Sequence, residues 1–158
     1  MSDDTTKTII EKITVTSKTP MIIPGTEHRS TIYYDCAQLT PGDLARLAAG
    51  ATGHLGAEDF DLALGVAYTG ILLASAVAGG RQVAIFGKDG AMYGPACKRR
   101  KVLIVNDVIY TGTEVSKAAD AARAAGGQIV GFACIIDRSA GSGELGGRPI
   151  YSAMQVKL

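Results

Sequence analysis

A chain of 158 residues with 47% hydrophobic and 20% charged side chains is long enough for one domain with a substantial core, and its composition excludes a disordered chain. With a formal net charge of +1, the molecule as a whole has no strong positive field that would attract nucleic acid. No apolar run is long enough to cross a bilayer. The three cysteines, Cys36, Cys97 and Cys134, match neither a disulfide framework nor a zinc-binding pattern. Since no secretion leader is recognisable, we expect a reducing, cytoplasmic setting.

The amino-terminal segment has no clear period. Residues 1–8 are polar, and we expect them to be disordered. The run at 13–16, Ile-Thr-Val-Thr, favours a strand, whereas Pro20 and Pro24 favour breaks. Residues 9–23 therefore receive no firm assignment.

Strands and helices alternate through the rest of the chain. A helix is predicted to begin after Thr40, because threonine is a good N-cap, Pro41 suits the first helical position and Asp43 adds an acid to the first turn. The further predicted strands are 60–66, 81–86, 102–105, 128–136 and 148–156, and the further predicted helices are 70–78 and 114–125. This order indicates an α/β fold with a mainly parallel central sheet flanked by helices, in which ligands bind beyond the carboxyl ends of the strands.

One strand-to-helix connection has the composition of a phosphate site. The aliphatic run 102–105 indicates a buried strand, Asn106 and Asp107 follow it, and residues 111–113, Thr-Gly-Thr, lead into a helix that Gly126 and Gly127 close. Free backbone N–H groups and the helix dipole favour an anion at such a helix start. The alternative is an ordinary strand-to-helix turn with chance threonine and glycine residues.

Three other connections fall at the same edge of the predicted sheet. Residues 65–70 join a strand to a helix through small residues that could hold a pyrophosphate, or form a plain tight turn. Residues 87–95, which include Lys88, have the composition of a lid, or of a mobile surface loop. Arg138 follows a strand, where its planar guanidinium could bind a carboxylate through two hydrogen bonds or could simply be solvated.

The segment 102–113 resembles the phosphoribosyl pyrophosphate signature of the type I phosphoribosyltransferases, with Asn106 where that family usually has its first acid. Neither a Walker loop nor a Gly-x-Gly-x-x-Gly turn is present. Within the family, four segments are similar to the orotate phosphoribosyltransferases, and they occur in the same order along the chain: 29–35, 67–71, 136–138 and 149–152.

This resemblance implies a fold, substrates and roles. It implies one phosphoribosyltransferase domain over 1–158, with a small hood segment at 9–35, and a homodimer. It implies transfer of phosphoribose from phosphoribosyl pyrophosphate to a base such as orotate, with release of pyrophosphate and with magnesium carried by the substrate rather than by a direct protein ligand. The implied catalytic residues are Asp107, Asn106 and Lys88; the implied phosphoribosyl pyrophosphate-binding residues are Tyr68, Thr69, Gly70, Asp107, Val108, Tyr110, Thr111, Gly112 and Thr113; and the implied base-binding residues are Arg138 and Arg29.

The departures from the family pattern keep a second interpretation open. Thr69 stands where the family's pyrophosphate loop usually has lysine, and the loop 87–95 offers only Lys88 as a clear cation. A catalytically weak or inactive regulator that binds phosphoribosyl pyrophosphate or a nucleotide is therefore the alternative. Tyr110 gives it slight support, because Asp-Val-x-Tyr-Thr-Gly also occurs in the pyrimidine-operon RNA-binding regulators. We expect no membrane partner and no nucleic-acid partner, since the basic run 98–101 is too short for an RNA-binding face.

Overall fold

A mainly parallel sheet forms the centre of the computed structural model, which describes residues 3–24, 26–139 and 141–156. Within these residues the sheet has eight strands, in the order β5-β4-β3-β6-β8-β10-β9, with β7 paired to β8. Their bounds are β3 Leu62–Val66, β4 Gln82–Phe86, β5 Met92–Tyr93, β6 Lys101–Val105, β7 Val108–Ile109, β8 Gln128–Asp137, β9 Glu144–Leu145 and β10 Arg148–Gln155. The short edge strands β5 and β9 are antiparallel to their neighbours, and the other pairs are parallel. The predicted fold class is confirmed.

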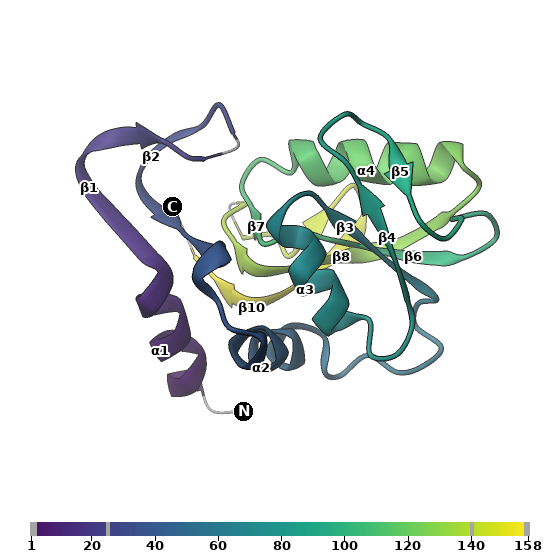
Figure 1. Cartoon of the computed structure of the whole chain (residues 1–158), viewed down its shortest axis with the longest axis horizontal. Coiled ribbons are helices and arrows are strands. Elements are labelled where there is room, and N and C mark those ends of the chain that lie inside the picture. Colours follow the sequence, from purple (N-terminus) through teal and green to yellow (C-terminus); the bar gives the residue numbers. More distant parts are fainter. Residues whose placement is uncertain (1–2, 25, 140, 157–158) are drawn as a thin grey trace.

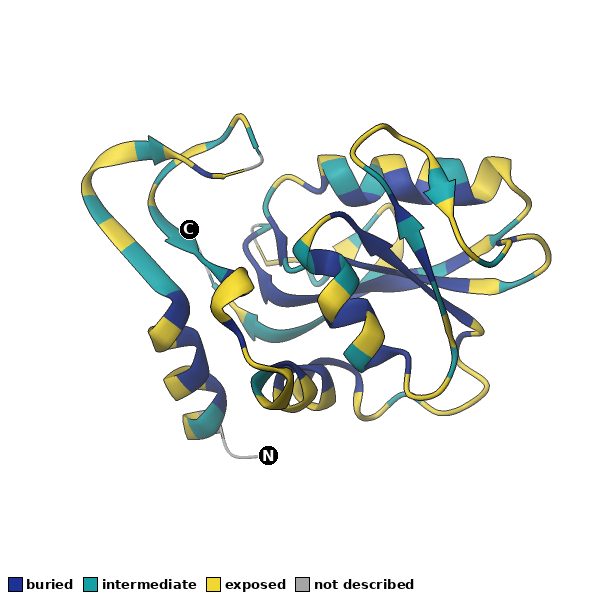
Figure 2. Ribbon diagram, viewed as in Figure 1, coloured by how far each residue is buried: buried dark blue, intermediate teal, exposed yellow. Residues whose placement is uncertain are grey.

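Helices cover both faces of this sheet (Figure 1). Helices α2 Pro41–Thr52 and α3 Thr69–Val77 pack on one face, and α4 Thr113–Ala124 packs on the other. The strands between them are buried on both sides, as Figure 2 shows, and every residue of β3 is buried. Continuous aliphatic runs at 62–66 and 102–105 suit this position, because a strand between two helical layers has no polar face.

The predicted start of α2 is confirmed in detail. The Thr40 hydroxyl accepts a hydrogen bond from the Asp43 backbone N–H at 3.1 Å, and the Asp43 carboxylate accepts one from the Thr40 N–H at 3.2 Å. This reciprocal capping box satisfies two backbone donors that a helix start would otherwise leave free. The end of α4 also follows the prediction, since Gly126 adopts a left-handed conformation with φ +89°.

The amino-terminal segment differs from the prediction. Residues 3–8, which were expected to be disordered, belong to helix α1 Asp3–Ile13; Met1 and Ser2 lie outside the described residues. The helix forms because Ile9, Ile10 and Ile13 share one face and enter the core beside α2. The chain then forms the hood, a hairpin of β1 Thr14–Ile22 and β2 Arg29–Tyr34 that leads into the short helix η1 Cys36–Gln38. Pro20 does not end β1, because the pairing of the two strands is interrupted between Thr16 and Met21.

The docking of α1 can be tested directly. Ile10 is 4% exposed in the core, so Ile10→Ala should lower the free energy of unfolding by about 2–5 kcal/mol. The matched control is Glu11→Ala, which removes an exposed side chain of the same helix and should change stability by less than about 0.5 kcal/mol. Urea denaturation measures both. Equal midpoints for the two variants would mean that α1 does not pack on the domain.

The segment 87–95, predicted as a loop, contains a tight turn and the short strand β5. It folds back as a tight turn into β5, with the Gly87 N–H bonded to the Ala91 carbonyl at 2.8 Å. The Asp89 carboxylate accepts the Ala91 N–H at 3.0 Å and the Tyr93 hydroxyl. These bonds give the turn a defined shape and place Lys88 at the edge of the sheet.

Of the described helices, none is long and apolar enough to span a membrane.

Candidate functional site

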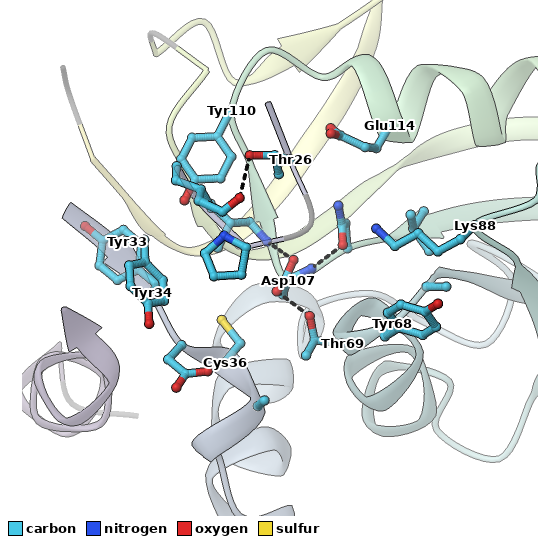
Figure 3. Close-up of a pocket in the computed structure, with 18 residues that line it drawn as sticks. Thr26, Tyr33, Tyr34, Cys36, Tyr68, Thr69, Lys88, Asp107, Tyr110 and Glu114 are labelled. Carbon is cyan, nitrogen blue, oxygen red and sulfur yellow. Dashed lines mark hydrogen bonds between the residues drawn. The ribbon is translucent and has the colours of Figure 1, made fainter. Parts of the chain in front are cut away.

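A cleft of about 350 Å³ lies at the carboxyl ends of the central strands, beneath the hood (Figure 3). Its lining comes from segments far apart in the sequence: Ile23, Pro24 and Thr26 of the hood, residues 33–37, residues 66–69, Lys88, residues 106–108, Tyr110 and Glu114. Parallel strands bring these connections together because all of them leave the sheet at one edge. Three of the four segments singled out in the sequence therefore meet here.

Asp107 is the carboxylate held most firmly in this cleft. It follows β6, and its side chain accepts hydrogen bonds from the Thr69 hydroxyl and, at 2.8 Å, from the Val108 backbone N–H. Burial raises the pKa of Asp107, while these two donors and the nearby Lys88 act in the opposite direction. The carboxylate is thus oriented by neutral donors, and its charge is incompletely compensated by the protein alone.

Two other groups surround Asp107. Asn106 turns its amide oxygen to accept the Asp107 backbone N–H at 2.9 Å. The Cys36 thiol also lines the cleft, and its pKa is raised by burial and by the negative charge of Asp107. Cys36 therefore remains a neutral thiol rather than a nucleophilic thiolate.

The predicted pyrophosphate loop lies across the cleft from the hood. Tyr68 is 73% exposed and Thr69 faces Asp107, while Gly70 lies directly against the end of β6. A Cβ atom at Gly70 would come within 2.8 Å of the Val105 carbonyl oxygen. Glycine is required here because helix α3 begins against the backbone of the neighbouring strand.

Gly70→Ala should consequently push the start of α3 away from Asp107. We expect a loss of stability of about 1–3 kcal/mol, the usual range for overpacking. Thermal unfolding measures this loss. Gly42→Ala is the control, because a Cβ there meets only the Thr40 hydroxyl, at 3.8 Å. Wild-type stability in Gly70→Ala would show that the helix start can shift without cost.

The predicted phosphate cradle, residues 111–113, forms the start of α4. Gly112 is left-handed with φ +82°, and its carbonyl accepts the Ser116 N–H at 2.9 Å as the first bond of the helix. The hydroxyls of Thr111 and Thr113 lie 2.9 Å apart on the exposed side of this turn. Two hydroxyls at a helix start make a concave donor surface suited to a phosphate. The structure thus places the cradle next to Val108 and Tyr110 of the cleft.

The two arginines predicted to bind the base are placed differently. Arg138 is buried, and its Nη1 donates to the Ile32 carbonyl of the hood at 3.2 Å. Its guanidinium lies 5.0 Å from the ring centroid of Tyr110 and 5.9 Å from that of Tyr34, and its Nε is buried without a hydrogen-bond partner. Arg138 therefore lies behind two tyrosines that line the cleft. Arg29 is exposed at the start of β2 and lies outside the residues that line the cleft.

Several lining residues were not among the predicted site residues. Tyr33, Tyr34 and Asp35 come from the end of the hood, and Glu114 comes from the first turn of α4. Glu114 had a local signal, as an acid one residue beyond the cradle. Residues 33–35 lie in the segment 29–35 that resembles the orotate branch, but their approach to the cleft depends on long-range packing of the hood.

The charges of the lining favour a substrate that carries a cation. The described lining residues include the carboxylates of Asp35, Asp107 and Glu114 and the ammonium of Lys88. Within residues 3–24, 26–139 and 141–156, no group of three His, Cys, Asp or Glu side chains is placed to hold a metal ion by itself. Oxygen ligands of this kind suit magnesium that arrives bound to a phosphate.

The comparisons with known proteins agree with this geometry. Residues 93–146 match the family model of the phosphoribosyl transferase domain. The chain is 39% identical over 109 residues to an orotate phosphoribosyltransferase of Xanthomonas campestris pv. campestris, an alignment that covers 60% of this chain and 49% of the relative. The chain thus spans about half the length of the curated relatives it matches.

Solved structures extend the similarity to the fold of nearly the whole chain. Orotate phosphoribosyltransferase from Aeropyrum pernix superposes with a TM-score of 0.76 at 21% identity, covering 95% of this chain and 93% of that one. The Mycobacterium tuberculosis H37Rv orotate phosphoribosyltransferase in complex with 5-phospho-alpha-D-ribosyl 1-diphosphate has a TM-score of 0.60 at 25% identity and covers 73% of each chain. The fold is that of the type I phosphoribosyltransferases. The chain is similar to phosphoribosyltransferases in sequence and fold, and its predicted resemblance to the orotate branch is confirmed.

Proposed function

We propose that this protein transfers phosphoribose from phosphoribosyl pyrophosphate to orotate and releases pyrophosphate. The observation that carries the proposal is the position of Asp107, which is held by Thr69 within one cleft that also adjoins the phosphate cradle at 111–113. The similar proteins named above support the transferase over the regulator, because they are named as orotate phosphoribosyltransferases.

Each part of the cleft has a role in this reaction. The cradle holds the ribose phosphate at the start of α4, and Asp107 accepts hydrogen bonds from the ribose hydroxyls. As the bond between the anomeric carbon and pyrophosphate breaks, positive charge develops on the ribose ring, and the Asp107 carboxylate stabilises it. Asn106 can exchange hydrogen bonds with a hydroxyl but cannot add charge.

Magnesium fits the described lining as part of the substrate complex. Bound to pyrophosphate, it neutralises the leaving group. The carboxylates of Asp35, Asp107 and Glu114 line the cleft together with Lys88, which supplies a protein cation. Because burial raises the pKa of Asp107, a cation brought by the substrate also favours the ionised carboxylate.

We also propose a homodimer in the cytoplasm. Tyr68, Leu72 and Tyr93 are large apolar side chains with exposed fractions of 73%, 48% and 51%. Tyr68 and Leu72 are one helical turn apart at the start of α3. The ammonium of Lys88 lies 5.5 Å from the Tyr68 ring centroid, and the next residue, Asp89, accepts a hydrogen bond from the Tyr93 hydroxyl. Such a patch beside a site supports association of two copies. A single monomeric mass by light scattering at micromolar concentration would contradict it.

The deciding experiment measures product and binding together. The protein is mixed with phosphoribosyl pyrophosphate, magnesium and a panel of bases that includes orotate, and pyrophosphate release is followed beside the heat of binding. Release with orotate alone is the expected result. Binding of phosphoribosyl pyrophosphate without release for any base would overturn the transferase and favour the regulator.

A further inference from the structure

The cleft continues into a second cavity of about 790 Å³, here called the outer basin. The two cavities share Thr26, Val66, Ala67, Lys88 and Glu114, so they form one continuous space. The outer basin lies between the hood tip, the turn after β4 and the first turns of α4. Its lining adds two cationic or ionisable nitrogen groups that the inner cleft lacks, His28 and Lys117.

The hood holds His28 in a defined position. The Ile23 N–H donates to the His28 carbonyl at 2.8 Å, and the His28 N–H donates to the Thr26 hydroxyl at 3.1 Å, which closes a tight turn. The imidazole ring lies 5.9 Å, centroid to centroid, from the ring of Tyr110, which lines the inner cleft. Thr26 and Tyr110 lie together on the hood side of the cleft, opposite Lys88 and Tyr68 (Figure 3). His28 therefore sits over the junction of the two cavities.

The charges around His28 define what can bind. Lys88 and Lys117 face the outer basin together with the carboxylates of Glu27, Asp89 and Glu114. Hydrogen bonds from the Tyr93 hydroxyl and the Ala91 N–H lower the pKa of Asp89 and commit its oxygens to its own turn. A phosphate oxygen in this basin would meet two lysines, and the imidazole of His28 would add a nitrogen donor beside them.

We propose that His28 is a substrate-contacting residue that donates a hydrogen bond to the pyrophosphate group of phosphoribosyl pyrophosphate in the outer basin. The proposal rests on the proposed function for the identity of the substrate. In this arrangement the sugar lies over Asp107, the ribose phosphate occupies the cradle at 111–113, and the pyrophosphate lies between His28 and Lys88. A hydrogen bond from the imidazole N–H to an ionised phosphate oxygen is charge-assisted, and it is stronger than one between neutral groups.

Magnetic resonance of the histidines tests this contact without turnover. The chain has two histidines, and His54 is the matched control because it also lies against a tyrosine, 5.4 Å from Tyr151, but lines neither cavity. On titration with magnesium pyrophosphate, we expect saturable shifts of the His28 ring signals and none of the His54 signals. Saturable heat of binding with unmoved His28 signals, equal shifts of both histidines, or no binding at millimolar probe would each overturn the proposal.

Variants supply a second readout. His28→Ala should weaken magnesium pyrophosphate binding and raise the KM for phosphoribosyl pyrophosphate by about tenfold, with a smaller change in kcat, whereas His54→Ala should match wild type. His28→Lys, which keeps a nitrogen donor at this position, should retain binding.

The two proposals can fail separately. Orotate-dependent release of pyrophosphate with wild-type constants in His28→Ala would overturn the role of His28 and leave the transferase intact. Histidine-specific binding of pyrophosphate in a protein that turns over no base would support His28 and overturn the transferase.

Discussion

Asp107→Asn is expected to lower kcat by about 10²–10³-fold, the range found when one preorganised charge-stabilising group is removed from an active site. Asparagine keeps the shape of the side chain, so one oxygen can still accept the Val108 N–H, which Asp107 accepts at 2.8 Å. In the proposed reaction, the variant loses the negative charge that would face the developing cation on the ribose. Steady-state pyrophosphate release at saturating substrates measures the change, and KM for phosphoribosyl pyrophosphate should change less than kcat.

The same variant should make the folded protein more stable at neutral pH. Burial raises the pKa of Asp107, so the folded protein holds this proton to a higher pH than the unfolded chain does. Its contribution to stability is therefore complete below the unfolded pKa and is lost as pH rises through the folded pKa. Asparagine cannot ionise, so the variant should escape that loss. Urea denaturation at pH 4 and pH 7 should show the advantage of the variant only at the higher pH.

A control variant with the same net charge as wild type tests whether the position of the carboxylate, and not only its charge, determines turnover. The double variant Asn106→Asp with Asp107→Asn keeps the net charge and moves the carboxylate by one residue. If the contacts to Thr69 and Val108 determine function, the double variant should stay slower than wild type, although the carboxylate at 106 should return part of the rate lost in Asp107→Asn. Near wild-type turnover of Asp107→Asn alone would show that Asp107 does not stabilise the transition state.

The elements predicted correctly are those whose causes are local. The capping box after Thr40 and the aliphatic run at 102–105 each need only a few adjacent residues, and both appear as expected. Helix α1 was missed because its only apolar face consists of three isoleucines, and its stability comes from packing on α2. The strand β5 was missed because two residues at a sheet edge carry no period.

The site residues also divide into those with a local sequence signal and those positioned by distant contacts. Asp107, Thr69 and residues 111–113 could be singled out as candidates because each lies within a short motif at a strand end. The position of Arg138 after a strand was also predicted, but the direction of its side chain was not. It is set by the carbonyl of Ile32, a residue 106 positions away, and by two tyrosine rings. Contacts of this range are decided by how the hood folds over the sheet.

Asn106→Asp is expected to have the opposite effect to Asp107→Asn on both rate and stability. The new carboxylate can still accept the Asp107 N–H, as the amide oxygen of Asn106 does at 2.9 Å, so the backbone should not move. It adds negative charge to the face of the cleft where cationic charge develops. If this is worth about 1–3 kcal/mol, as for a charged hydrogen bond, kcat rises roughly ten- to a hundredfold, with a smaller change in affinity.

The gain should depend on pH and should cost stability. Two adjacent carboxylates disfavour each other's ionised forms, so the new carboxylate raises the pKa of Asp107 further. The positive charge of Lys88 acts in the opposite direction and lowers that pKa. The acidic limb of the pH–rate profile of Asn106→Asp should therefore move to higher pH, and its unfolding free energy at pH 7 should fall below that of wild type. Asn106→Ala, which removes the hydrogen bond without adding charge, should show neither the faster turnover nor the displaced limb. An unchanged rate in Asn106→Asp at pH 8 with saturating magnesium would mean that the missing acid does not limit this protein.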